Sequence, residues 1–317
     1  MQKKSLVSIA IATYNGSFFL KEQLDSIYNQ TYKNIEVVVT DDCSSDSTLQ
    51  ILEEYHQKHG LIYHSNEHNL GFLKNFEKAI SLCNGDYIAL CDQDDVWIPN
   101  KIELEFRTLL EIEHSVGKNI PILIFSDLQI VDYELNATSD LFYNSPNFNP
   151  YKTSCNHLLV QNVVTGCTAF FNLALKNIAI PIPTNATYHD HWLAMIASIF
   201  GEIKFLNVKT VYYRQHSRNC VGSGKREDRY LWKALKKLIK IFLLPLDNEK
   251  FRLTFEYQFR LSREVCKLNN IPDEIYETCN FWGNLENVSF FRRKFNIINK
   301  NLLRHTILEK MEMIVRL

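Results

Sequence analysis

The first hundred residues alternate between short apolar runs and stretches in which apolar residues recur every three or four positions. The apolar, β-branched runs predict strands at 6–12, 35–40, 61–64 and 87–91. Between these strands, apolar residues recur with helical spacing, which predicts helices at 18–28, 47–59 and 71–82. This alternation predicts an α/β fold in which a parallel or mixed sheet carries helices on both faces.

The rest of the chain continues the alternation less regularly. Its pattern predicts a helix from Pro99 to about Ser115, a second helix at 189–200, and strands at 120–125, 163–171, 203–206 and 210–214. Residues 136–152 are rich in Asn, Ser and Pro, which indicates a surface loop. Beyond residue 223 the pattern becomes helical and basic.

Polar side chains follow each of the first four predicted strands. They are Tyr14 and Asn15, Asp41 and Asp42, Asn66 and Asn69, and Asp92, Asp94 and Asp95. Asn and Asp also favour turns for local reasons, so each residue alone is weak evidence. Because open α/β sheets bind ligands at the carboxyl ends of their strands, four such ends in succession favour a ligand crevice.

Composition and charge limit the possible domain organisation and the kinds of ligand for each part of the chain. The 317 residues are 46% hydrophobic and 22% charged, which is enough for a sizeable core in one α/β domain with an appendage or in two domains. Residues 1–224 carry 16 Lys and Arg against 24 Asp and Glu, whereas residues 225–317 carry 19 against 12. The acidic part suits a metal or polar substrate, and the basic part suits an anionic surface.

The cysteines and the start of the chain bear on its compartment. The eight cysteines include no C-x-x-C pair, and the first residues lead into the first strand without a secretory signal. No stretch reaches about 18 uninterrupted apolar residues, the length of a spanning helix. We therefore expect a reduced, cytoplasmic protein.

The sequence Asp92-Gln93-Asp94-Asp95 is the candidate metal site. A hard divalent cation takes carboxylate oxygens, and two Asp residues separated by one residue at a strand end let two of these oxygens converge. Such a cation neutralises a pyrophosphate leaving group. Alone, the motif also fits an exposed acidic turn that caps the helix after Pro99.

Four motifs occur in an order and spacing that resembles glycosyltransferase family 2, whose members have the GT-A fold. They are Ala12-Thr13-Tyr14-Asn15-Gly16, Thr40-Asp41-Asp42-Cys43-Ser44, Asn69-Leu70-Gly71 and Asp92-Gln93-Asp94-Asp95-Val96-Trp97. As an ordered set they are highly specific, and the resemblance spans about residues 5–220. It implies a nucleotide-sugar donor, inversion at the anomeric carbon and a Mg²⁺ or Mn²⁺ cofactor. Cys43 departs from the family's usual glycine, which puts the turn after Asp42 in doubt.

By this resemblance, Tyr14 packs against the base of the donor, and Asp42 accepts a hydrogen bond from its imide with Asp41 nearby. A pyrimidine suits these residues, because it offers an N–H donor and a flat face. Asp92 holds either the ribose or the metal, and Asp94 binds the metal directly. The alternative for Tyr14 is an aromatic side chain that fills the core. The remaining expected donor-binding residues are Thr13, Asn15 and Asn69.

The sequence Tyr188-His189-Asp190-His191-Trp192 opens the helix predicted at 189–200. Inverting transfer needs a base that removes the proton of the acceptor hydroxyl, and Asp190 matches the family's usual position for it. The alternative for Asp190 is a helix N-cap. His189 and His191 are expected to be capping or packing residues.

The sequence Tyr213-Arg214-Gln215-His216 resembles the end of the family's catalytic region. His216 then supplies a nitrogen ligand to the metal, and Arg214 meets the phosphates of the donor. The alternative for His216 is an ordinary surface histidine. The residues expected around the acceptor are Asp127, Gly166 and Trp192.

The resemblance also implies a domain organisation and a reaction. A catalytic domain occupies 1–223, with a donor half at about 1–95 and an acceptor half at about 96–223, and a basic helical region occupies 224–317. The motifs look most like bacterial rhamnosyltransferase-type members that build surface polysaccharides. The implied reaction moves L-rhamnose from dTDP-L-rhamnose to a saccharide, and a UDP-hexose is the alternative donor.

Residues 229–244 predict a basic amphipathic helix. Leucine, isoleucine and phenylalanine side chains share one helical face, and four lysines lie largely on the other. This pattern fits peripheral contact with an anionic membrane, and a basic-aromatic cluster at 290–295 supports it. With a lipid-linked acceptor, the protein would work at the inner face of the cell membrane. The alternative is a helix that packs on the catalytic domain.

Three other functions fit the sequence less well. A sugar nucleotidyltransferase is expected to carry a glycine-rich, basic phosphate loop after its first strand, and residues 12–16 are not such a loop. A non-catalytic nucleotide-sugar-binding assembly subunit is expected to lack Asp94 or Asp190. The basic tail has no recognisable nucleic-acid-binding module, so we expect no nucleic-acid partner.

Overall fold

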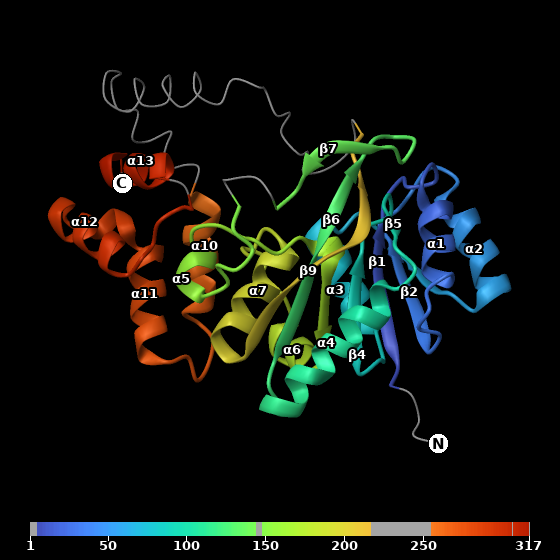
Figure 1. The fold of residues 1–317 in the computed structure, drawn as a ribbon, viewed down its shortest axis with the longest axis horizontal. Coiled ribbons are helices and arrows are strands. Elements are labelled where there is room, and N and C mark those ends of the chain that lie inside the picture. Colours follow the sequence, from blue (N-terminus) through green and yellow to red (C-terminus); the bar gives the residue numbers. More distant parts are fainter. Residues whose placement is uncertain (1–4, 144–147, 217–254, 306, 317) are drawn as a thin grey trace. The chain divides into compact units, whose positions relative to one another are not determined.

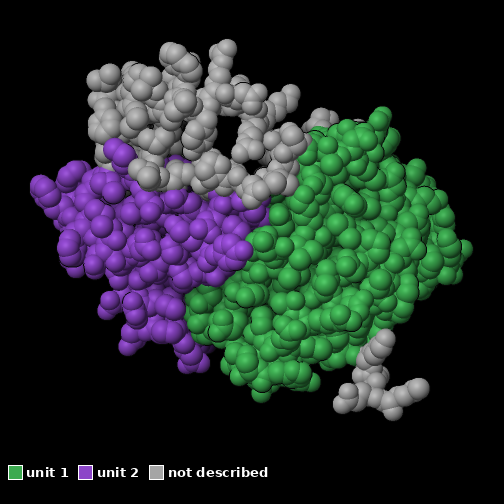
Figure 2. Space-filling model, viewed as in Figure 1, with its two compact units in different colours: residues 1–142, 164–184, 188–222 green, residues 143–163, 185–187, 223–317 purple. Residues whose placement is uncertain are grey.

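Strands and helices alternate along the first 214 residues, and the C-terminal part is helical (Figure 1). The structure is a computed structural model that describes residues 5–143, 148–216, 255–305 and 307–316. The chain divides into two compact units (Figure 2). Unit 1 comprises residues 1–142, 164–184 and 188–222, and unit 2 comprises 143–163, 185–187 and 223–317. The helix predicted at 229–244 lies outside the described residues.

Unit 1 is built on a nine-stranded sheet of strand order β3-β2-β1-β4-β8-β6-β9-β5, with β7 paired to β6. The pairs β1–β2, β2–β3, β1–β4 and β6–β9 are parallel, whereas β8 runs antiparallel to β4 and β6, so the sheet is mixed. The strands are β1 (Val7–Thr13), β2 (Ile35–Asp41), β3 (Ile62–Ser65), β4 (Tyr87–Cys91), β5 (Val96–Trp97), β6 (Ile122–Val131), β7 (Ala137–Leu141), β8 (Ala169–Asn172) and β9 (Glu202–Arg214).

Helices cover both faces of this sheet, as the apolar pattern predicts. Val7, Ile9 and Ile11 of β1 point into a core shared with α1, α2 and α4, because alternate side chains of a strand face the same way. On the other face α3 packs against β1 and β2, and α7 packs against β6 and β9. The helices of this unit are α1 (Leu20–Tyr28), α2 (Thr48–His59), α3 (Phe72–Leu82), α4 (Lys101–Val116), α6 (Leu173–Ala179) and α7 (His189–Phe200).

Unit 2 is helical in the part that the structure describes. Its core centres on Trp282, whose ring meets Phe255 and Phe259 edge-on at centroid distances of 5.9 and 5.3 Å. Among the described residues of the chain, no helix is long and apolar enough to cross a membrane. The helices of unit 2 are α5 (Cys155–Leu158), α10 (Glu256–Val265), α11 (Asp273–Gly283), α12 (Phe290–Asn299) and α13 (Ile307–Arg316), with a 3₁₀ turn at Leu285–Asn287.

The predicted strands and helices of the first hundred residues are confirmed to within about two residues. The later elements differ more. β7 lies inside the loop predicted at 136–152, and β9 is one strand where two were predicted. Its pairing with β6 shifts register beside Asp127, and this irregularity interrupts the apolar alternation without ending the strand.

Candidate active site

The carboxyl ends of β1, β2 and β4 lie side by side. Thr13 at the end of β1 pairs with Asp41 at the end of β2, and Ile11 pairs with Cys91 at the end of β4. Because these strands are parallel neighbours, the segments that follow them emerge at one edge of the sheet. The predicted site residues of these three segments are therefore brought together.

Tyr14 follows β1 and exposes 52% of its surface, so the alternative that its ring fills the core is wrong. Its backbone is held by Gln93 through two hydrogen bonds. The Tyr14 amide donates to Gln93 Oε1 at 2.9 Å, and Gln93 Nε2 donates to the Tyr14 carbonyl at 3.1 Å. A Cβ atom at Gly16 would lie 2.2 Å from Gln93 Oε1, so a larger residue there would displace the Gln93 side chain from Tyr14.

Asn15 and Thr13 connect the β1 loop to the β2 loop. Asn15 adopts a left-handed backbone, and its side-chain oxygen accepts a hydrogen bond from the Ser45 amide at 2.8 Å. Thr13 Oγ1 donates to Asp41 Oδ1 at 2.8 Å. These contacts place both residues beside the expected donor site as organisers of its loops.

Asp42 is buried and accepts three hydrogen bonds from the loop after β3. The donors are the amides of Leu70 at 2.7 Å and Gly71 at 2.9 Å, and Asn66 Nδ2 at 2.9 Å. Asn69 Nδ2 donates to the Asp42 carbonyl at 3.2 Å. A carboxylate offers about four acceptor sites, so these donors leave at most one for the imide of a base. The imide contact stays a prediction.

The turn after Asp42 keeps the backbone of the family pattern without its glycine. Cys43 has a φ of 63°, in the left-handed region that a side chain disfavours. Its thiol donates to the Asn66 carbonyl at 3.0 Å, which helps to hold this conformation. The doubt about the turn is thus resolved, because the turn forms with a strained cysteine.

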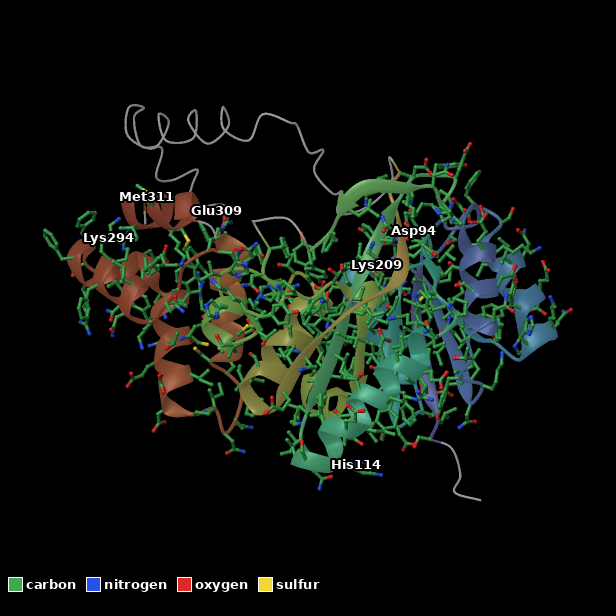
Figure 3. The ribbon with its side chains drawn as sticks, in the orientation of Figure 1. Asp94, His114, Lys209, Lys294, Glu309 and Met311 are labelled. Atoms are coloured by element: carbon green, nitrogen blue, oxygen red, sulfur yellow. The ribbon has the colours of Figure 1, made fainter. Side chains whose placement is uncertain are left out.

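Asp92, Asp94 and Asp95 are at least half-buried, so the acidic motif is not an exposed turn, and Asn100 rather than an Asp is the N-cap of α4. Burial, with added repulsion from Asp94 and Asp190, raises the pKa of Asp92 to about 8. Burial also raises the pKa of Asp94, although the facing His216 partly offsets this shift. Figure 3 shows Asp94 beside the short strand β5.

Asp95 is fully buried, and the sequence analysis did not include it among the ligands. Its Oδ1 accepts a hydrogen bond from the Arg214 amide at 3.1 Å, whereas Oδ2 has no nitrogen or oxygen donor among the described residues. The thiol of Cys167 faces this carboxyl group, and ligand atoms of Asp92, Asp95 and Cys167 lie within 4.8 Å of one another. The proximity of Cys167 could not be predicted, because it depends on how β8 packs beside β4.

These acidic residues fit a divalent cation. Several carboxylates share a buried region, the pKa values of Asp92 and Asp95 are raised, and Asp95 Oδ2 has no nitrogen or oxygen donor in the part of the chain that the structure describes. A cation would relieve this repulsion and complete the missing contact. The oxygen-rich set of Asp92, Asp94 and Asp95 suits Mg²⁺ or Mn²⁺ better than a thiolate-preferring metal.

His216 lies beside the acidic motif, as predicted. Its Nε2 is 2.9 Å from Asp94 Oδ2, and its ring stacks on Phe19 at a centroid distance of 4.6 Å. The side chain is only 10% exposed, so the alternative of an ordinary surface histidine is wrong. Phe19, which the sequence analysis missed, fixes the imidazole against Asp94.

The structure corrects the expectation that Arg214 meets the donor phosphates. Its guanidinium is buried and donates to the carbonyls of Asp94 and Tyr133 and to the carboxylate of Glu22, while it lies over the ring of Phe19. Each of the three guanidinium nitrogens thus donates to the protein. Arg214 acts here as a brace that holds the backbone of Asp94.

Asp190 is the second residue of α7, and the N-cap is Tyr188, so the capping alternative for Asp190 is wrong. Its Oδ1 accepts a hydrogen bond from the His191 amide at 2.6 Å. Gly166 packs closely against this segment, because a Cβ atom there would lie 2.9 Å from His189 Nε2 and 3.7 Å from Asp190 Cβ. Gly166 therefore allows the start of α7 to approach the end of β4.

His189 is a packing residue, as expected. Its ring stacks on Phe76 at 4.0 Å, and burial lowers the pKa of His189 to about 3, so the imidazole is neutral near pH 7. His191 is also buried. Neither side chain is exposed toward solvent as a competing base.

The residues expected around the acceptor separate into two groups. Gly166 lies against Asp190, and Asp127 is half-buried at the register shift of β6, where its Oδ1 accepts from the Leu128 amide at 2.8 Å. The expectation that Trp192 lies around the acceptor is wrong, because its indole is buried in the core and donates to the Ala179 carbonyl at 2.7 Å. It cannot border an acceptor pocket in this conformation.

Comparisons with known proteins agree with this geometry. A family model described as "Glycosyl transferase family 2" matches residues 8–178, more than half of the chain. An uncharacterized glycosyltransferase of Rickettsia typhi is 29% identical over 244 residues, which is 74% of this chain and 73% of the relative. TuaG of Bacillus subtilis, named for teichuronic acid biosynthesis, is 26% identical over 74% of this chain and 86% of its own length.

Solved structures show the same fold. S. aureus TarS residues 1–349, in complex with UDP-GlcNAc, has a TM-score of 0.54 and 21% identity, over 94% of this chain and 79% of that chain. The mannosyltransferase PcManGT from Pyrobaculum calidifontis, in complex with GDP-Man and Mn²⁺, has a TM-score of 0.53 and 16% identity, over 95% of this chain and 74% of that chain. The predicted GT-A type fold is confirmed, and the protein is a glycosyltransferase. By its matching residues and its fold, the chain belongs to glycosyltransferase family 2.

Proposed function

We propose that this enzyme transfers a hexose from a nucleotide-diphosphate sugar to a hydroxyl of a saccharide, with inversion, in the synthesis of a bacterial surface polysaccharide. The observation that carries the proposal is the proximity of Asp190 to the acidic motif. After burial and Asp94, the charge of Asp190 is the next cause that raises the pKa of Asp92. A candidate base thus lies near the candidate metal ligands, although the two come from β4 and α7.

The donor half of the site would bind the nucleotide and its pyrophosphate. The exposed ring of Tyr14 offers a face for the base, and Thr13, Asn15, Asp41 and Asn69 hold the loops around it. Asp92, Asp94 and His216 would hold Mg²⁺ or Mn²⁺, with Asp95 behind them. When bound, that cation supplies positive charge for the nucleotide-diphosphate leaving group.

Asp190 would remove the proton from the acceptor hydroxyl as its oxygen attacks the anomeric carbon. A carboxylate suits this role because it is ionised near pH 7 and needs to accept only one proton. Asp190 lies in the first turn of α7, at the positive end of the helix dipole. Because Gly166 has no side chain, the start of α7 with Asp190 can lie close to it.

For the donor we propose dTDP-L-rhamnose, on the resemblance of the motifs, with a UDP-hexose as the alternative. TarS and PcManGT were solved with UDP-GlcNAc and GDP-Man, so different bases occur within similar folds. The test is a panel of dTDP-, UDP- and GDP-sugars, measured by thermal shift and by donor hydrolysis with Mn²⁺ and with EDTA. Stabilisation by dTDP-rhamnose above all others supports the assignment, and a preference for another donor overturns it.

We further propose that residues 1–223 form the catalytic domain and that the acceptor is lipid-linked. Residues 224–317, with their net basic charge, would then contact the inner face of the cell membrane. The predicted contact at 229–244 lies outside the described residues. Flotation of the full-length protein with anionic and zwitterionic vesicles tests it, and equal absence from both would contradict it.

A further inference from the structure

Helix α12 in unit 2 exposes an unusual amount of apolar surface. Phe291 is 85% exposed, Phe295 68% and Ile298 53%. At 3.6 residues per turn, these three positions fall on one face of the helix. Phe290, 58% exposed, lies near one side of that face. Single exposed apolar residues are ordinary, but a stripe of large ones on one helix marks an interaction surface.

The side of α12 away from this stripe packs within unit 2, and these contacts determine the orientation of the helix. Ile297 is fully buried, and Arg293 Nη2 donates to the Val288 carbonyl at 3.0 Å. Lys294, which Figure 3 shows on α12, donates to the Ile314 carbonyl of α13. The stripe of Phe291, Phe295 and Ile298 is thus turned outward while the opposite side packs within the unit.

The sequence around this stripe is basic. Residues 287–308 contain five Lys or Arg residues and no Asp or Glu. Arg292 is exposed on one side of the stripe, and Lys294 lies on the other side, 4.9 Å from the ring of Phe290. Aromatic side chains between cations match the interface of an anionic bilayer, where rings reach the acyl boundary and cations meet the phosphates.

We propose that α12 docks on an anionic lipid bilayer, with Phe291, Phe295 and Ile298 inserted below the headgroups and Arg292 at the level of the phosphates. This inference rests on the proposed membrane contact and assigns it to a described helix. A second copy of the chain fits less well, because a two-fold contact through α12 would place like charges opposite one another.

The test measures binding of the full-length protein to phosphatidylcholine vesicles with and without phosphatidylglycerol. Wild-type protein should bind the anionic vesicles, and Phe291→Ser with Phe295→Ser should weaken binding at least about tenfold, since each buried ring contributes strongly. Arg292→Glu should weaken binding to anionic vesicles several-fold. The matched control is Tyr151→Ser with Tyr276→Ser, which removes two exposed rings of unit 2 outside α12 and should leave binding unchanged.

Two results would overturn the proposal. One is wild-type affinity of the double phenylalanine variant for anionic vesicles, which would place any membrane contact elsewhere in the chain. The other is an absence of vesicle binding by the wild type together with self-association, measured by light scattering, that the double variant loses. Donor hydrolysis in solution does not involve α12, so failure of the proposed function would appear there and leave the vesicle result independent.

Discussion

The ends of β2 and β4, the two strands that flank β1, both carry adjacent aspartates, but in opposite surroundings. At the end of β2, Asp41 accepts hydrogen bonds from Thr13 Oγ1, the Ser44 amide and Ser44 Oγ at 2.6 to 2.9 Å, and Asp42 accepts three more. At the end of β4, burial and mutual repulsion raise the pKa of Asp92, and Asp95 Oδ2 lacks a nitrogen or oxygen donor within the described part of the chain.

This difference indicates that the β2 carboxylates have a structural role and the β4 carboxylates a chemical one. The β2 carboxylates are stabilised by the protein itself, so they serve to order the loops around the donor site. The β4 carboxylates are held close together without enough donors, which is unfavourable unless a cation binds. The same residue type in equivalent positions therefore has two roles, and substitutions at the two ends should act on different properties.

The largest expected effect is on activity at the β4 end. Asp94→Asn should lower transfer by at least about 10⁴-fold, because it removes a charged ligand from the proposed cation site at the leaving group. Stability should change by less than about 1 kcal/mol, since relief of repulsion offsets the weakened contact with His216. Transfer assays and urea unfolding measure the two. Full wild-type activity in EDTA would contradict a metal role.

Asp190→Asn should slow the chemical step by roughly 10²–10⁴-fold, because the amide cannot accept the acceptor's proton. Donor affinity should remain close to that of the wild type, since the nucleotide is bound at the strand ends. The measurements are the transfer rate with a suitable acceptor and nucleotide-sugar affinity by calorimetry. Near-normal turnover would assign the base to another residue.

At the β2 end the same chemical change should act on stability. Asp42→Asn replaces one carboxylate oxygen by an NH₂ group, which must face either the Gly71 amide or the donors of Leu70 and Asn66, and should destabilise the fold by about 3 kcal/mol. Asp94→Asn is the isosteric control at the end of β4, on the other side of β1. Equal loss of stability in the two variants, measured by urea unfolding, would remove the distinction between these ends.

Asp92 should make the folded protein less stable as pH rises, whereas a carboxylate with a lowered pKa makes it more stable. The folded pKa of Asp92 is raised to about 8, above its unfolded value, so the folded state holds the proton more tightly. Its contribution is fully present below the unfolded pKa and is lost as pH rises toward about 8. In EDTA, the wild type should lose on the order of 4 kcal/mol more than Asp92→Asn between pH 5 and pH 8. Identical slopes for the two proteins would contradict this.

Much of this fold could be predicted because its signals are local. The β-branched runs and helical spacing of the first hundred residues locate those elements, and parallel order follows from their alternation. The antiparallel insertion of β8 between β4 and β6 could not be predicted, because it joins segments about 80 residues apart in one case. β7 has no apolar alternation and forms only by pairing with β6.

The positions of site residues could be predicted where a sequence motif contains them. They could not be predicted where packing between distant segments determines which groups a side chain contacts. His216 and Asp94 lie together as their motifs suggested. The burial of Trp192 and the protein partners of Arg214 depend on contacts with Ala179, Tyr133 and Glu22, which no spacing in the sequence reveals. An arginine at a catalytic edge can bind phosphate or brace a loop, and only its neighbours decide between them.

Gln93 links the β4 motif to the β1 loop, so it tests whether the two strand ends act together. Gln93→Ala should remove both hydrogen bonds to the Tyr14 backbone and so release the ring that we propose faces the base. We expect the KM for the donor to rise about tenfold, the equivalent of about 1.4 kcal/mol for two partly exposed hydrogen bonds, with kcat changed little. The loss falls on binding because Asp94 and Asp190 keep their own partners. Gln57→Ala, which removes an exposed hydrogen bond to Glu53 on α2, is the control and should leave both constants unchanged. A fall in kcat with an unaltered KM would show that Gln93 positions the acidic motif instead of the nucleotide.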